Sequence, residues 1–144
     1  MQHFFRFFLI AVISLSVFAT AACSHQENYL SNGETKLKAG DNKDAIAIFT
    51  KAIKNRPKLA TSDLAKAYFD RGIAKRALGK SEAAKVDFRK AVNIDPKPVN
   101  AEAYRTRGLA KSALGDARGA KSDFSVAASL GDSTARKLIK SSNS

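Results

Sequence analysis

The apolar positions of this chain repeat as three copies of one pattern. In each copy, a tyrosine is followed by a glycine four residues later and by a second glycine seven residues after the first. An alanine, a phenylalanine and another alanine come next, separated by four and three residues, which is the spacing of one helix face. The residues are Tyr29, Gly33, Gly40, Ala45, Phe49 and Ala52; Tyr68, Gly72, Gly79, Ala84, Phe88 and Ala91; and Tyr104, Gly108, Gly115, Ala120, Phe124 and Ala127. Three copies of one helical hairpin indicate a solenoid.

Breaks in the pattern mark the ends of the helices. The second glycine of each copy ends the first helix of a hairpin, because glycine adopts the left-handed C-cap conformation at little cost. The expected N-caps of the second helices are Asp41, Ser81 and Asp116. Pro57 and Pro96 end the second helix in the first two copies, since the residue before a proline avoids the helical region. Helices are therefore predicted at residues 26–39, 42–55, 62–78, 81–94, 100–114 and 117–130.

On a common frame of 34 positions, the copies cover residues 26–59, 65–98 and 101–134, with residues 60–64 and 99–100 inserted between them. The tyrosine is then at position 4, the glycine at 8, the alanines at 20 and 27, the phenylalanine at 24 and the proline at 32. This arrangement resembles the tetratricopeptide repeat, whereas a 36-residue Sel1-like hairpin fits the insertions less consistently. The resemblance implies an all-α fold, a right-handed α-solenoid of three hairpins within residues 26–140. Residues 133–140 are expected to form a helix that caps the last hairpin, and residues 141–144 a frayed tail.

Other repeated residues have roles inside the hairpin. The small residues at positions 8 and 20 are expected to let its two helices approach closely. Arg71 and Lys75 recur with Asp87 as Arg107, Lys111 and Asp123, and an ion pair between these positions would tie the two helices together. The first copy has Asn32, Lys36 and Ile48 there and lacks the pair. Partly exposed pairs of this kind contribute only about 0–1 kcal/mol to stability.

The N-terminus has the features of an export signal. Arg6 precedes an apolar stretch of 16 residues, Phe7 to Ala22, which is shorter than the roughly 20 residues that a membrane-spanning helix needs. The length therefore favours a signal peptide over residues 1–22, removed after export, against the alternative of a transmembrane anchor.

Cys23 is the only cysteine of the chain. The segment Thr20-Ala21-Ala22-Cys23 resembles the lipobox of bacterial lipoproteins, although that family usually has leucine in place of Thr20. The resemblance implies lipid attachment at Cys23, a short tether over residues 23–25, and a periplasm-facing anchor, in the outer membrane if the host has one. Ordinary cleavage after Ala19-Thr20-Ala21, giving a soluble periplasmic or secreted protein, is the alternative. It would leave an unpaired thiol in an exported chain.

The chain is strongly basic. Its 25 lysines and arginines exceed its 13 acidic residues by 12, and removal of residues 1–22 would leave a net charge of +11. Such a field favours anionic partners. A basic surface is expected on the second helices, formed by Lys51, Lys54, Arg89, Lys90 and Lys121. It would suit anionic lipid or cell-wall polymer; the export signal and the lack of interleaved aromatic residues disfavour nucleic acid.

The resemblance also implies a partner-binding groove along the first helices of the hairpins. The expected groove residues are Leu30, Phe69, Ile73 and Leu109, flanked by Arg76 and Arg105. They would suit a protein or peptide with an apolar face and an acidic residue, the alternative being that these side chains pack between repeats. The carboxylate clamp of chaperone-binding tetratricopeptide domains looks absent. The positions aligned to it hold Leu30, Glu34, Asp70, Glu102 and Thr106.

Residue types argue against catalysis. After cleavage the chain would keep one histidine, His25, which lies outside the repeats. No Cys–His or Ser–His–acid set can be assembled within the repeats, and we expect neither a cofactor nor a bound metal. The sequence therefore predicts a non-catalytic adaptor or scaffold of the cell envelope that binds a protein partner in the groove. The alternative is an electrostatic binder of anionic lipid or cell-wall polymer.

Overall fold

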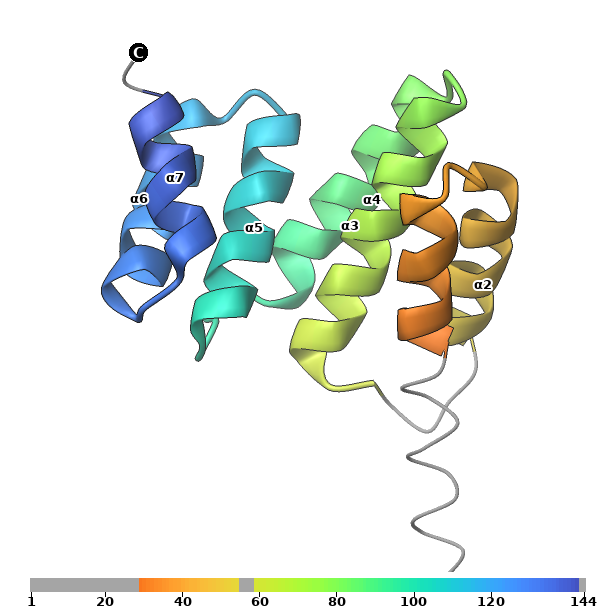
Figure 1. Ribbon diagram of the computed structural model, residues 1–144, viewed down its shortest axis with the longest axis horizontal. Helices are drawn as coiled ribbons and strands as arrows, with labels where there is room; N and C mark the ends of the chain where they lie inside the picture. Colours follow the sequence, from red (N-terminus) through yellow and green to blue (C-terminus); the bar gives the residue numbers. More distant parts are fainter. Residues whose placement is uncertain (1–28, 55–58, 143–144) are drawn as a thin grey trace, which may run out of the picture.

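The computed structural model describes residues 29–54 and 59–142, which form an all-α solenoid (Figure 1). A helix over residues 29–38 is followed by α2 (Asn42–Lys54), α3 (Thr61–Ala77), α4 (Ser81–Ile94), α5 (Ala101–Ala113), α6 (Ala117–Ser129) and α7 (Ser133–Ser141). From α2 onward, each helix packs on the next along the chain, and α3 also contacts α5. Residues 1–22, for which a signal peptide is predicted, and Cys23 and Pro57 lie outside the described residues, so the predictions made for them stay predictions.

The predicted turns are confirmed. From α2 to α7, every helix begins and ends within two residues of its predicted bounds. Gly40, Gly79 and Gly115 have φ angles of 81°, 73° and 88°, the left-handed conformation expected at a helix C-cap. A fourth turn of this kind, which the sequence pattern did not predict, is formed by Gly131 between α6 and α7, with a φ of 101°.

The helix starts follow the prediction only in part. Asp116 caps α6, because its Oδ1 accepts a hydrogen bond from the Gly119 N–H at 2.8 Å. The prediction for Ser81 was wrong. Ser81 is the first residue of α4, and Lys80 holds the cap position without a side-chain hydrogen bond. Lysine has no acceptor atom, so it cannot satisfy the free N–H groups of the first turn.

Each hairpin is closed by a phenylalanine that packs on a glycine. Phe49 and Phe88 are 0% and 1% exposed, and Phe124 is also buried. A Cβ atom placed on Gly72 would lie 2.6 Å from Cε1 of Phe88, and Gly33 and Gly108 stand in the same relation to their phenylalanines. Real Cβ atoms do not approach a ring so closely. The expected close approach of the paired helices is therefore confirmed, and only glycine allows it.

The repeated ion pairs form, but they are more buried than expected. Asp87 lies 2.8 Å from Nη2 of Arg71 and 2.7 Å from Nζ of Lys75, and its side chain is 1% exposed. Asp123 is held in the same way by Arg107 and Lys111, at 2.6 and 2.9 Å. The prediction that these pairs are partly exposed was wrong for the carboxylates, whose side chains are 1% and 4% exposed. In each hairpin, the two helices approach closely at the glycine and enclose the carboxylate between them.

The arginines of these pairs also join neighbouring hairpins. Nη1 of Arg71 donates to the Thr50 hydroxyl of α2 at 3.0 Å, and Nη1 of Arg107 donates to the Pro96 carbonyl after α4. Each arginine therefore neutralises the carboxylate of its own hairpin and contacts the preceding one. Since the guanidinium group has five donors in a fixed plane, it can serve both partners at once.

Candidate functional site

The solenoid presents two faces made by different helices. We call the outward side of the helix over residues 29–38, α3 and α5 the A-helix face, and the outward side of α2, α4 and α6 the B-helix face. In Figure 1, α3 lies in front and α4 behind it. The expected groove residues belong to the A-helix face, and the residues of the expected basic surface belong to the B-helix face.

The apolar groove residues are half-buried and belong to three separate clusters. Leu30 packs against the core around Phe49, whereas Phe69 and Ile73 pack against the core around Phe88. The ring centroids of Phe69 and Phe88 are 5.7 Å apart. Leu109 belongs to the cluster of the third hairpin. These side chains therefore support their own hairpins and present only their edges on the A-helix face.

The two groove arginines differ in their surroundings. Arg76, at the end of α3, is exposed, and its guanidinium carbon lies 5.5 Å from the centre of the Phe88 ring. Arg105 is half-buried, and its Nε lies 2.7 Å from Oδ2 of Asp132, the N-cap of α7. It also approaches Glu102 at 3.9 Å. Arg105 therefore fastens α7 to α5, and Arg76 is the better candidate to meet a carboxylate of a partner.

An acidic cluster that the sequence did not reveal joins the helix over residues 29–38 to α3. Nζ of Lys66 lies 2.6 Å from Glu34 and 3.0 Å from Asp70, which is 8% exposed. Burial raises the pKa of Asp70, and the nearby charges of Glu34 and Glu102 add to the rise although Lys66 opposes it. The spacing of four residues between Lys66 and Asp70 is that of a helical pair, a signal not used in the sequence prediction, whereas the contribution of Glu34 depends on how two hairpins pack.

The tie between α5 and α7 carries a testable prediction. Asp132→Ala removes both the Arg105 contact and the cap bond from the Ala135 N–H, which is 2.8 Å long. Losing a cap typically costs about 1–2 kcal/mol, and α7 packs chiefly on α6. We therefore expect amide hydrogens of residues 133–141 to exchange about 5–30 times faster in the variant, as measured by mass spectrometry.

The matched control for that experiment is Asp116→Ala, which removes a cap of the same kind from α6. It leaves the contact between Arg105 and Asp132 in place, so exchange in residues 133–141 should stay unchanged. Unchanged exchange in the Asp132 variant would show that apolar packing alone holds α7 in place.

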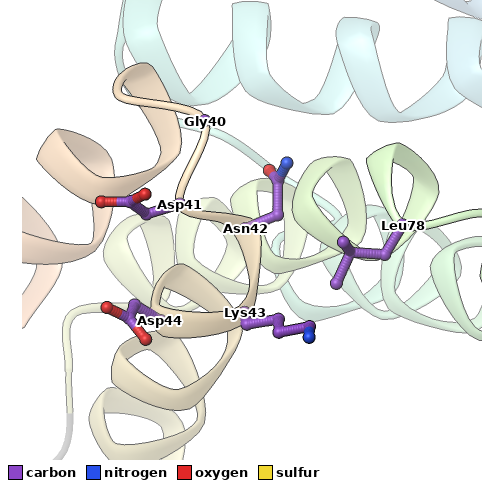
Figure 2. Close-up of a pocket in the computed structure, with 6 residues that line it drawn as sticks. All are labelled: Gly40, Asp41, Asn42, Lys43, Asp44 and Leu78. Atoms are coloured by element: carbon purple, nitrogen blue, oxygen red, sulfur yellow. The ribbon is translucent and has the colours of Figure 1, made fainter.

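An open hollow of about 360 Å³ lies beside the turn between the first helix and α2. Its lining residues are Gly40, Asp41, Asn42, Lys43, Asp44 and Leu78. Figure 2 shows Lys43 extending toward the side on which Leu78 lies, Asn42 standing upright between Gly40 and Leu78, and Asp41 and Asp44 directed to the other side. Lys36 engages both carboxylates, at 3.3 and 3.4 Å. The hollow thus offers an amide and an ammonium group but no nucleophile beside a base.

Two further properties concern the described parts of the chain alone. Within residues 29–54 and 59–142, no three histidine, cysteine or carboxylate side chains are grouped so that they could hold a metal ion. None of the helices in these ranges combines the length and apolar character needed to cross a bilayer.

The residues of the expected basic surface are all exposed on α2, α4 and α6. Nζ of Lys90 lies 5.2 Å from the centre of the Tyr68 ring, which places it between α4 and α3. Lys51 occupies in α2 the position that Lys90 occupies in α4. The structure thus brings the cations of two consecutive units to equivalent positions on one face.

Comparison with known proteins supports the repeat and the fold. Residues 65–98 match the tetratricopeptide repeat. These are the bounds predicted for the second copy. The crystal structure of the Sgt2 TPR domain from Aspergillus fumigatus is similar, with a TM-score of 0.57 and 22% sequence identity over 83% of this chain and 77% of that domain. The search of curated proteins gave no match.

These findings bear on the class of protein. The second copy matches the tetratricopeptide repeat, and the arrangement of the helices is similar to the fold of a tetratricopeptide domain. Such domains typically act as protein-interaction scaffolds without catalytic activity. At this level of identity the likeness to the Sgt2 domain shows the fold alone.

Proposed function

We propose that this protein is a non-catalytic adaptor of the bacterial cell envelope that binds a protein or peptide on its A-helix face. In this proposal the chain is a lipoprotein anchored through Cys23, with its repeats facing the periplasm. The apolar stretch before Cys23 and the position of this single cysteine support the anchor.

One observation carries the choice of face. The half-buried edges of Phe69 and Ile73 lie on the same side of α3 as the exposed Arg76, at intervals of four, three and seven residues. A partner helix or extended segment could cover the apolar edges and place a carboxylate on Arg76. The acidic cluster around Lys66 lies about 15 Å before Arg76 along α3, at 1.5 Å per residue. Acidic groups therefore lie near the start of α3 and a cation lies at its end. This difference in charge would orient a bound segment.

Site-specific crosslinking tests this proposal. Ser112 takes in α5 the position that Arg76 takes in α3, whereas Ser122 is an exposed serine of the B-helix face. A photoreactive residue at Ser112, in the full chain in its native membrane, should crosslink to one partner protein. The same residue at Ser122 serves as the matched control and should not give this product.

The charge reversal Arg76→Glu should weaken the crosslink at Ser112 about tenfold or more, because it places like charges against each other in the contact. Circular dichroism should show that the exposed substitution leaves the fold intact. A crosslink at Ser122 in place of Ser112, or one indifferent to Arg76, would refute the assignment of the A-helix face.

A further inference from the structure

The exposed charges of the second helices are almost all positive. Helices α2, α4 and α6 carry eight basic residues, and all eight are exposed. They carry four carboxylates, of which Asp87 and Asp123 are buried against cations of α3 and α5. Only Asp44 and Glu82 remain exposed on these helices. Because two of the four carboxylates are buried in ion pairs, the exposed charges of the B-helix face are mostly positive.

Each of α2 and α4 carries two of these cations close together. Lys51 and Lys54 lie one turn apart in α2, and Arg89 and Lys90 are adjacent in α4. Val86, one turn before this last pair, is 47% exposed, so an apolar side chain stands among the basic ones. Basic residues around an exposed apolar residue are typical of surfaces that lie on a membrane, where lysines meet phosphate groups and the apolar side chain enters the interface.

We propose that the B-helix face docks on anionic lipid headgroups through Lys51, Lys54, Arg89 and Lys90, with Val86 at the centre of the contact. Every aromatic side chain among the described residues is buried or half-buried, which leaves no exposed ring for stacking on the bases of a nucleic acid. Cys23, the predicted lipid attachment site, precedes Tyr29 by six residues, so an anchored chain would hold the repeats near the headgroups. The docking is independent of a partner on the A-helix face.

Flotation with lipid vesicles tests the docking. The protein is a chain beginning at Ser24, which keeps every helix within the described residues and lacks the apolar N-terminus; its thermal melt is recorded first. The vesicles contain phosphatidylcholine alone or with phosphatidylglycerol. The B-helix variant replaces Lys51, Lys54, Arg89 and Lys90 by glutamine. The matched control replaces Lys38, Lys80, Lys97 and Lys137, four exposed lysines outside α2, α4 and α6, and has the same net charge.

The parent chain should bind only the anionic vesicles, and less at high salt, since a Debye length of about 3 Å at 1 M salt screens the contact. The B-helix variant should lose binding at least about tenfold, and the control variant less than about threefold. Equal losses in the two variants, or no preference for anionic vesicles, would overturn the proposal.

A second variant separates lipid from a soluble polyanion. Val86→Asn should lower vesicle binding about threefold, because part of an exposed valine enters the apolar interface. Its binding to inorganic polyphosphate or to a single-stranded oligonucleotide, which offers no such interface, should not change. If the parent chain binds either polymer more tightly than it binds vesicles, the partner of this face is a soluble polyanion and not a lipid surface.

Discussion

Asp87→Ala should lower the free energy of unfolding by about 3–5 kcal/mol, the usual cost of removing one partner from a buried ion pair. The variant would leave Arg71 and Lys75 facing each other within the seam between α3 and α4, where both are largely covered by neighbouring side chains. Chemical denaturation followed by circular dichroism measures the loss. The control is Asp44→Ala, which removes an exposed partner of Lys36 and should cost less than about 1 kcal/mol.

The first hairpin suggests how the loss can be reversed. It has Asn32 and Ile48 in place of an arginine and an aspartate, and no ion pair of this kind. The double variant Arg71→Asn with Asp87→Ile should therefore be more stable than Asp87→Ala, because it removes one of the two cations left without their carboxylate and fills the place of the aspartate with an apolar side chain. Equal stabilities for Asp87→Ala and the Asp44 control would show that the buried pair does not stabilise the hairpin.

The same variant can be followed by its pH dependence. Burial disfavours the charged form of Asp87, but hydrogen bonds from Arg71 and Lys75 outweigh it and hold the pKa of this carboxyl below its ordinary value. Stability from such a group is fully present above the unfolded pKa of about 4 and is lost as the pH falls through the folded pKa. Asp70, whose pKa burial raises, acts in the opposite direction. In Asp87→Ala, the loss of stability below about pH 5 should accordingly be shallower than in the parent.

Gly72→Ala should cost about 2–3 kcal/mol, although alanine is the better helix former by about 1 kcal/mol. The new methyl group would stand 2.6 Å from Cε1 of Phe88, and this ring is 1% exposed and has no free space to enter. Either the ring leaves its rotamer or α3 and α4 move apart. Thermal melts of Gly72→Ala and Gly108→Ala should show similar losses, because the geometry of the two hairpins is the same.

A smaller partner side chain should rescue the glycine variant. Phe88→Leu alone loses apolar contacts and destabilises the fold, but in combination with Gly72→Ala it makes room for the methyl group. In a double-mutant cycle, the double variant should therefore lose less stability than the sum of the losses of the two single variants. Strict additivity would mean that the methyl group and the ring do not meet.

The sequence predicted the features that recur within each hairpin, but not the contacts that join one hairpin to another. Three features were predictable because their residues recur at equal separations within one hairpin. They are the glycine turns, the burial of the phenylalanines between paired helices, and the ion pairs of Asp87 and Asp123. The depth at which the carboxylates are buried was not, since it depends on how closely two helices approach. The prediction of the α4 cap failed because Ser81, a residue type that favours the N-cap, lies one position after the N-cap, inside the helix.

The candidate site was less predictable than the fold. The role of Arg105 depends on α7 returning against α5, and its partner Asp132 is 27 residues away. Glu34 and Lys66 are likewise 32 residues apart and meet only because consecutive hairpins pack side by side. Nothing in the local pattern distinguishes Arg105 from Arg76, yet the packed structure engages the first and leaves the second exposed.

The order of helix contacts has a consequence for how the chain forms. From α2 to α7, packing joins helices that are adjacent in the chain, or next but one in the case of α3 and α5. No early segment has to wait for the C-terminus, because each new helix finds its partner within the part already made. Such local contacts favour rapid folding. If the chain is exported as proposed, its hairpins can therefore stack one after another on the far side of the membrane, and the stacked hairpins would resist backward sliding before translocation ends.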